Sequence, residues 1–313
     1  MTDQSSGFSA TPGRDGRGDA PDIPPELHTP LVPDHGRAGR DLPAAIAVGV
    51  GAGLAVVLSL LFWNWGFVLF VAAALSLAAI EIHQALRRLG MRSAIVPIVV
   101  GTVAIVVGSY FAGQQQPQEV PSNTILLAAL GLTVMAALIW RMPGGQDNFV
   151  RDVAASMFII GYVPLLGSFA SLMLAGDQGT ARIVAYALIV VMSDLGGYIV
   201  GVLIGKHPLA PRISPKKSWE GLGGSVLFGV AAGIAMAVSG LGVPWWVGLV
   251  LGLALVAVGV CGDLVESLIK RDVGIKDMSS FLPGHGGVMD RLDSLLLAAP
   301  AAWFILYLLV PGG

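Results

Sequence analysis

The sequence predicts an all-α, polytopic integral membrane protein of about nine transmembrane helices, preceded by a disordered N-terminal arm. Two observations support this fold class, and the charge and cysteine content exclude others. The 313 residues are 55% hydrophobic and only 12% charged, whereas soluble domains carry about 25% charged residues. Apolar runs long enough to cross a bilayer recur to the end of the chain. The formal net charge of −2 gives no sign of a nucleic-acid binder, and the single cysteine, Cys261, cannot form a disulfide within one chain.

Residues 1–42 make up the predicted arm. They are rich in Pro, Gly, Asp, Arg and Ser and contain almost no aliphatic run, so they cannot bury enough surface to offset the entropy of ordering. The arm also lacks the basic start and short apolar core of a secretory signal. We therefore expect a cytoplasmic arm that is not cleaved.

The apolar runs place the membrane spans. At about 20 residues for each span, helices are expected at residues 43–63, 66–85, 94–112, 124–141, 152–175, 182–204, 221–239, 244–269 and 291–311. We divide these into N-terminal transmembrane helices, residues 43–180, and a C-terminal transmembrane catalytic region, residues 181–313. The division follows the polar motifs, which gather in the second part.

The positions of Lys and Arg predict the orientation, because cytoplasmic loops near membrane spans are enriched in them. With the N-terminus inside, every Lys and Arg except Arg182 falls on the inner side. An odd number of spans then places the C-terminus on the opposite side. Two inner segments, 206–220 and 270–293, concentrate charge, Gly and Pro, so we expect any chemistry to occur there.

Several carboxylates lie in or near the predicted spans. An unpaired carboxylate at the centre of a span costs about 2.5–3.5 kcal/mol on insertion scales, so Asp194, Asp263 and Glu266 need compensation. A spacing of three puts Asp263 and Glu266 on one helix face, where they repel each other unless a cation lies between them. Glu81 is a different case, because Arg87 and Arg88 follow within two helical turns, and we expect an ordinary structural ion pair there.

Asp290 and Asp293 repeat this spacing at the start of the last predicted helix. Acidic residues in a first turn can simply compensate the helix dipole. Here, however, basic side chains surround them, which adds groups that bind phosphate to oxygen ligands that suit Mg²⁺. These basic residues are Lys270, Arg271, Lys276 and Arg291. The region therefore indicates a phosphate-transfer site.

The other inner segment, 206–221, combines three prolines with basic and hydroxyl side chains. A basic loop of this kind is often only a topology determinant or a contact for anionic lipid. Ser214, Lys216 and Lys217, followed by Gly221, nevertheless supply the hydroxyl, ammonium and accessible backbone groups of a phosphate cradle. The pattern is not that of a Walker A loop, and both interpretations stay open at this point.

Two stretches of the chain resemble the phosphatidate cytidylyltransferases, also called CDP-diacylglycerol synthases. Residues 267–293 read SLIKRDVGIKDMSSFLPGHGGVMDRLD and match the family signature without departure. Residues 193–221 are also similar, although the family commonly has SDTGAY where this chain has SDLGGY, so Leu195 and Gly197 depart from the pattern. The resemblance covers roughly residues 185–295, and the preceding helices are similar only in hydropathy.

The resemblance implies an enzyme in the cell (inner) membrane that converts CTP and phosphatidic acid into CDP-diacylglycerol and pyrophosphate. It implies a requirement for Mg²⁺, one ion or two, held by Asp263 and Asp290, and a monovalent cation such as K⁺ stays open. Asp194, Glu266 and Asp293 would support the metal. The resemblance also places His285 in the active site and favours a homodimer. The candidates to hold phosphate groups are Ser214, Lys216, Lys217, Lys270, Arg271, Lys276 and Arg291.

Other functions remain open on the sequence alone. A related CTP-dependent lipid enzyme, such as a CDP-archaeol synthase or a polyprenol kinase, would have the same composition. A cation-coupled transporter also carries intramembrane carboxylates, but it predicts repeated halves, and the chain shows no convincing repeat. A catalytically silent scaffold is disfavoured, because it would retain costly charges in the membrane without a ligand.

Overall fold

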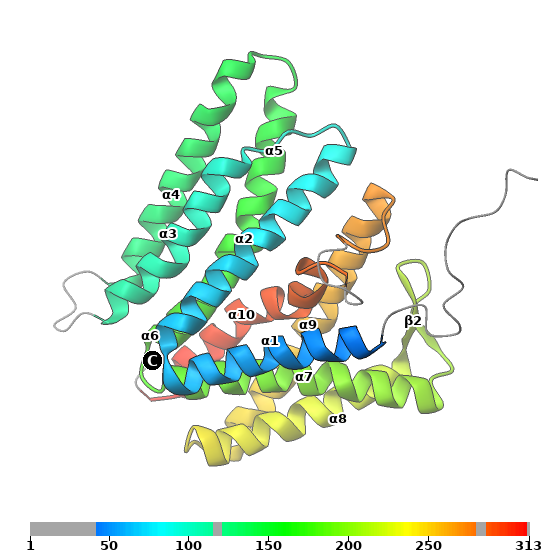
Figure 1. The fold of residues 1–313 in the computed structure, drawn as a ribbon. Coiled ribbons are helices and arrows are strands. Elements are labelled where there is room, and N and C mark those ends of the chain that lie inside the picture. The colour runs from blue at the N-terminus through cyan, green and yellow to red at the C-terminus, as the bar shows by residue number, and fades with distance from the viewer. Residues whose placement is uncertain (1–41, 115–120, 280–285, 312–313) are drawn as a thin grey trace, which may run out of the picture. The chain divides into compact units, whose positions relative to one another are not determined.

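The computed structural model describes residues 42–114, 121–279 and 286–311. The burial of individual residues is described at position 51 and from position 53 onward. Within these ranges the chain is almost entirely helical, as Figure 1 shows. The helices are α1 Leu42–Phe62, α2 Asn64–Arg88, α3 Ile95–Gln114, α4 Ser122–Arg141, α5 Phe149–Ile160, α6 Leu166–Ala175, α7 Gly179–Ile204, α8 Trp219–Ala235, α9 Trp245–Val273 and α10 Met289–Leu309. The predicted N-terminal arm lies outside the described residues.

The membrane-spanning prediction is confirmed. Eight helical segments of the described chain are long and apolar enough to cross a bilayer, and α1, which is 21 residues long, is a ninth candidate. One of the eight joins α5 and α6 through the π-helical turn Gly161–Leu165, which contains Pro164. Each predicted span coincides with its helix to within four residues at either end.

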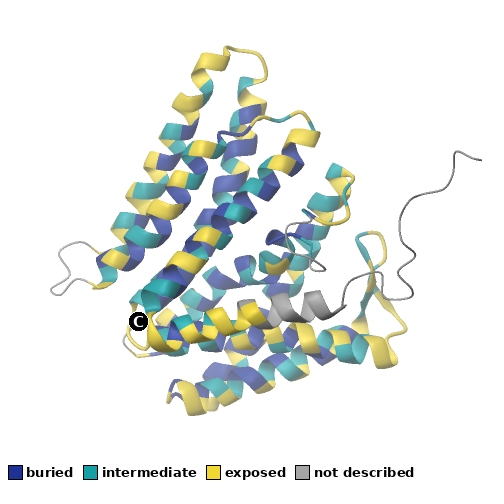
Figure 2. Ribbon diagram, viewed as in Figure 1, coloured by how far each residue is buried: buried dark blue, intermediate teal, exposed yellow. Residues whose placement is uncertain are grey.

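Exposed apolar side chains cover the outside of the helices. Figure 2 shows α2 with long buried stretches, whereas α4 is exposed along much of its length. Val100 and Leu127, for example, are each 65% exposed. A soluble protein rarely exposes large contiguous apolar patches, so these surfaces fit a hydrocarbon environment. The chain is a multi-pass membrane protein.

Helices α7 and α8 pack backbone against backbone, and Figure 1 shows them side by side. A Cβ atom on Gly196 would lie 2.6 Å from the carbonyl oxygen of Gly224, and one on Gly224 would lie 2.5 Å from that of Gly196. Only glycine allows this approach. Small residues at four-residue intervals commonly bring membrane helices together in this way, and here they bring Asp194 on α7 close to α8.

This contact gives a stability prediction. Gly224→Ala is expected to separate α7 from α8 and to lower the thermal unfolding midpoint in detergent by several degrees, because the new methyl group meets backbone that cannot move alone. Gly223→Ala is the matched control, since a Cβ there meets no atom within 4 Å. Equal midpoints for the two variants would contradict this account of the packing.

The segment between α7 and α8 is a β-hairpin, which the all-α prediction missed. Strand β1, Pro208–Ala210, pairs antiparallel with β2, Ser214–Ser218. Glu220 stabilises the base of the hairpin by accepting hydrogen bonds from the backbone N–H groups of Lys206 (3.1 Å) and His207 (3.2 Å). Two strands this short give no alternating apolar pattern, so the sequence predicted only a loop.

A buried carboxylate joins neighbouring ends of the N-terminal helices. Asp152 on α5 is 2% exposed and accepts hydrogen bonds from the backbone N–H of Arg92 (2.7 Å) and from Nε of Arg141 (2.7 Å). Arg92 lies between α2 and α3, and Arg141 ends α4. Asp152 and Arg141 therefore form a structural ion pair of the kind that was expected for Glu81.

Candidate active site

A cavity of about 380 Å³ opens between α7, the hairpin, the start of α8 and α9. Four of the predicted site residues line it: Asp194 from α7, Lys216 and Lys217 from β2, and Asp263 from α9. Apolar side chains such as Val202 and Val260 line other parts of the wall. The cavity thus combines charged and apolar surface, which suits a ligand with both a phosphate group and a hydrocarbon part.

An ion pair crosses this cavity. Nζ of Lys217 lies 2.5 Å from Oδ2 of Asp263, and the opposite oxygen, Oδ1, accepts a hydrogen bond of 3.3 Å from Ser267. The side chains of Lys217 and Asp263 are 25% and 34% exposed, respectively. Because both remain accessible, a ligand that enters the cavity can reach either partner.

Two further carboxylates interact electrostatically with this pair. Asp194 interacts electrostatically with Lys217 and Asp263. Asp293 interacts electrostatically with Asp263 and Asp194. Within the described ranges neither Asp194 nor Asp293 forms an ion pair of its own. The cavity lining therefore balances the carboxylates of Asp194 and Asp263 against the ammonium groups of Lys216 and Lys217, and Asp293 also interacts with the charge of Lys270.

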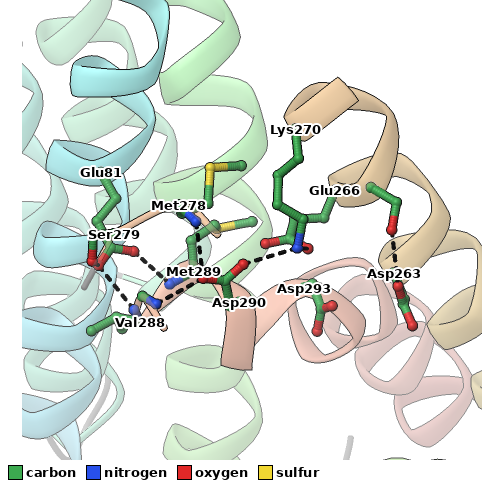
Figure 3. A network of polar contacts seen from close by, with 12 residues as sticks. Glu81, Asp263, Glu266, Lys270, Met278, Ser279, Val288, Met289, Asp290 and Asp293 are labelled. Carbon is green, nitrogen blue, oxygen red and sulfur yellow. Dashed lines mark hydrogen bonds and ion pairs between the residues drawn. The ribbon is translucent and has the colours of Figure 1, made fainter. Parts of the chain in front are cut away.

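A second group of charges, the Lys270 network, consists of Glu266, Lys270 and Asp290 (Figure 3). Lys270 lies between the two carboxylates: its Nζ pairs with Glu266 one helical turn away and lies 2.9 Å from Oδ1 of Asp290. The side chains of Glu266 and Asp290 are only 1% and 8% exposed. The sequence led us to expect one cation between Asp263 and Glu266, but in the structure Asp263 pairs with Lys217 and Glu266 pairs with Lys270.

The start of α10 supplies the other contacts of Asp290. Its Oδ2 accepts hydrogen bonds from the backbone N–H groups of Gly287 (2.7 Å) and Met278 (3.0 Å). Carboxylates are favourable at helix N-termini, where backbone N–H groups lack partners within the helix. Asp290 therefore stabilises the conformation of the loop between α9 and α10 and also pairs with Lys270. The sequence treated helix-dipole compensation and a site role as alternatives, but the geometry of Asp290 is compatible with both.

Glu81 contradicts the expectation of a local pair with Arg87 or Arg88. It lies on α2, is 5% exposed, and accepts hydrogen bonds from Oγ of Ser279 (2.6 Å) and from the backbone N–H groups of Val288 (2.9 Å) and Met289 (2.7 Å). Figure 3 shows it on α2, with its carboxylate directed at Val288 and Met289 at the start of α10. Apart from a carboxylate inside an apolar helix, no feature of the sequence indicated this contact.

Tyr162 is another residue that the sequence analysis missed. It lies on the π-helical turn between α5 and α6 and is 6% exposed, and its hydroxyl has no hydrogen-bond partner among the described residues. The hydroxyl feels the charges of Glu266 and Asp293. Such π-helical turns are frequent at functional sites, and this one extends the site to the N-terminal helices.

The other predicted site residues that the structure describes belong to the hairpin, to the last turn of α9 and the segment after it, and to the first turn of α10. Ser214 begins strand β2 and is half-buried. Arg271 ends α9, Lys276 follows it, and Arg291 lies in the first turn of α10; all three are exposed. His285 lies outside the described residues. The structure thus brings Asp194, Lys217 and Asp263 together at the cavity. Glu266, Lys270 and Asp290 form a separate group. Asp293 interacts electrostatically with members of both groups.

The acidic residues can be tested for their fit to Mg²⁺. Among the described residues no three His, Cys, Asp or Glu side chains form a cage for a metal ion. Mg²⁺ rarely uses such a cage, because it usually binds through one or two carboxylates together with substrate phosphates and water. Asp263, whose side chain is 34% exposed at the cavity, could supply one such carboxylate to an ion that arrives with a phosphate ligand. Asp263 and Asp290 each face a lysine, so their shared metal role stays a prediction.

These features define the class of the protein. A multi-pass membrane protein with ammonium and carboxylate groups concentrated at the ends of its apolar helices is suited to phosphate chemistry beside a bilayer. Comparison with known proteins gives the family. The profile of the Cytidylyltransferase family matches residues 43–309. The chain belongs to this family and is an enzyme.

Curated relatives agree with this assignment. The chain is 42% identical over 289 residues to a phosphatidate cytidylyltransferase of Mycobacterium leprae, covering 87% of this chain and 90% of the relative. It is 40% identical over 287 residues to the phosphatidate cytidylyltransferase of Mycobacterium tuberculosis strain H37Rv, covering 87% and 84%. A phosphatidate cytidylyltransferase of Bacillus subtilis is 42% identical over 134 residues, covering 42% of this chain and 50% of the relative.

Proposed function

We propose that this enzyme transfers the cytidylyl group of CTP to phosphatidic acid at the cytoplasmic face of the cell membrane, producing CDP-diacylglycerol and pyrophosphate. The observation that carries the proposal is the cavity between α7, the hairpin and α9, where Lys217 and Asp263 face each other among apolar side chains. Relatives named phosphatidate cytidylyltransferase cover most of the chain and support the choice of substrates.

The proposed reaction forms one bond and breaks one. An oxygen of the phosphatidate phosphate attacks the α-phosphorus of CTP, and the bond from that phosphorus to the bridging β-oxygen breaks as pyrophosphate leaves. The phosphatidate oxygen is already ionised at neutral pH, so no side chain needs to remove a proton. The protein's contribution is therefore to position two anions and to reduce their repulsion.

The residues divide this work by location. Lys216 and Lys217 on the hairpin are placed to hold phosphate groups in the cavity, and Lys270 is placed to do so beside the start of α10. Asp263, together with Asp293 or Asp290, would hold Mg²⁺. The ion would supply neutralising charge to the triphosphate. Asp194 lines the same cavity as Lys217 and interacts electrostatically with it.

The proposed reaction also implies how the protein is oriented in the membrane. CTP is available on the cytoplasmic side, so the hairpin and the α9–α10 loop must face that side, with the N-terminus inside and the C-terminus opposite. We also retain the homodimer as a proposal, and the mass of the detergent-solubilised protein measures it directly.

Two labels in CTP test the proposed reaction. Purified protein in detergent, supplied with phosphatidic acid and Mg²⁺, is expected to transfer label from [α-³²P]CTP to the lipid and none from [γ-³²P]CTP. A lipid kinase would give the reverse pattern. Removal of Mg²⁺ by EDTA should stop transfer, and readdition should restore it; parallel assays in K⁺ and Na⁺ show whether a monovalent cation contributes. Folded protein that labels no lipid under any of these conditions would refute the proposal.

A further inference from the structure

We propose that Glu81 is a positioning residue of the active site, which fixes the start of α10 and through it the carboxylate of Asp290. The inference rests on the proposed function, because it concerns how the same site is held. It also extends the site to α2, outside the stretches that carry the motifs.

The contacts of Glu81 come from a single short segment. Oε1 accepts hydrogen bonds from Ser279 and from the N–H of Val288, and Oε2 accepts one from the N–H of Met289. Ser279 lies in the loop after α9, and Val288 and Met289 lie at the start of α10. A single buried carboxylate thus joins the loop after α9 to the start of α10.

The approach of Glu81 depends on Gly287. A Cβ atom at this position would lie 2.6 Å from Oε2 of Glu81, closer than real Cβ contacts come. The carboxylate therefore occupies space that is available only because residue 287 has no side chain. The same glycine donates its N–H to Asp290, so the contacts of Glu81 and Asp290 meet at one residue.

From this point the contacts continue into the candidate active site. Asp290 follows Val288 and Met289 directly in the sequence, and its other oxygen lies 2.9 Å from Nζ of Lys270. Lys270 in turn pairs with Glu266. Within the described part of the chain, the hydrogen bonds of Glu81 go to Ser279, Val288 and Met289, and Glu81 does not line the cavity, so it acts through the position of Asp290 and not on a substrate.

The charge and shape of a carboxylate are both required. Three donors face the two oxygens of Glu81, and a glutamine offers one oxygen and one NH₂ group. The NH₂ group would face an N–H or O–H donor, which leaves at least one buried donor without an acceptor. Such a change shifts the start of α10, and a displacement of about 1 Å can lower a rate about 100-fold.

The experiment compares Glu81→Gln with Asp152→Asn. Both variants neutralise a buried carboxylate that accepts backbone N–H groups across loops, but Asp152 lies in the structural ion pair of the N-terminal helices. We expect Glu81→Gln to lower kcat about 10- to 100-fold, to change KM for CTP less than about threefold, and to raise the Mg²⁺ concentration for half-maximal activity. Asp152→Asn should leave all three values near wild type in the folded fraction.

Hydrogen–deuterium exchange provides a readout that does not depend on activity. In Glu81→Gln, the amides of Val288 and Met289 should exchange at least about tenfold faster than in wild type, while those of α5 stay unchanged. Gly287→Ala, which keeps the carboxylate but blocks its approach, should reproduce the loss of kcat. The losses should not add in the double variant, because both changes remove one contact.

The outcomes separate this inference from the proposed function. If wild-type protein transfers no cytidylyl group, the proposed function fails, while the exchange measurement still tests the contact. If wild type is active and Glu81→Gln keeps its kcat and its Mg²⁺ dependence, the positioning role is refuted. It is equally refuted if Asp152→Asn lowers kcat and shifts the Mg²⁺ dependence to the same extent. If Glu81→Gln does not fold, the kcat and Mg²⁺ dependence of Gly287→Ala test the positioning role instead.

Discussion

Asp263→Asn is expected to lower kcat by about 100- to 1,000-fold, the usual cost of removing one preorganised electrostatic group from an active site. The amide loses the negative charge that faces Lys217 and that would hold Mg²⁺. The protein should still fold, because Asp263 is one-third exposed and its contacts are confined to two side chains in the site. The measurement is steady-state transfer of label from [α-³²P]CTP at several Mg²⁺ concentrations.

Asp177→Asn is the matched control for this prediction. Asp177 is exposed and precedes α7, at the end of that helix opposite the hairpin, so its variant should keep wild-type kcat. If Asp263→Asn retained more than about one-third of the wild-type rate, Asp263 would have no role in binding metal or in ordering Lys217. Asp290→Asn is a less selective change, because Asp290 also accepts two backbone hydrogen bonds that shape the loop.

Lys270→Met is expected to give the largest loss of stability in the site. The change leaves Glu266 and Asp290 buried without their shared cation, and breaking a buried ion pair in this way costs about 3–5 kcal/mol. We expect a lower thermal midpoint in detergent and a large fall in expression. Adding Glu266→Gln to Lys270→Met removes one of the two stranded charges, so it should recover part of the midpoint.

The same double variant separates stability from catalysis. If Lys270 holds a substrate phosphate, the recovered protein should remain inactive although it is folded. If activity returned together with stability, Lys270 would be only the counter-ion of Glu266 and Asp290. Arg271→Met serves as the control for charge alone, because Arg271 is exposed and its loss should change stability little.

The sequence predicted most of the fold, since a bilayer imposes a strong pattern. Each span needs a run of apolar residues of nearly constant length, so the positions of the helices followed from hydropathy alone. The β-hairpin at Pro208–Ser218 was missed because its order comes from contacts at its ends, such as Glu220 with the backbone of Lys206 and His207. Those contacts leave no periodic pattern in the sequence.

For the site, the sequence could identify residue types but not their partners. Asp263 and Glu266 were expected to share a cation between them, whereas in the structure each pairs with its own lysine, Lys217 and Lys270. The Glu266–Lys270 pair follows the ordinary i,i+4 spacing of a helix, but Lys217 lies 46 residues from Asp263 in the chain, and only helix packing brings that pair together. Glu81 shows the limit most clearly, because it reaches Ser279 over 198 residues. Nearby arginines offered a simpler pairing that the fold does not use.

The reach of Glu81 has a consequence for how the enzyme is made. Synthesis proceeds from the N-terminus, so α2 enters the membrane long before Ser279, Val288 and Met289 leave the ribosome. Until the start of α10 is in place, the carboxylate lacks the backbone N–H donors of Val288 and Met289. The partly synthesised chain therefore carries an acidic group inside a helix that lipid tolerates poorly, and insertion of the last helix completes the contacts of Glu81.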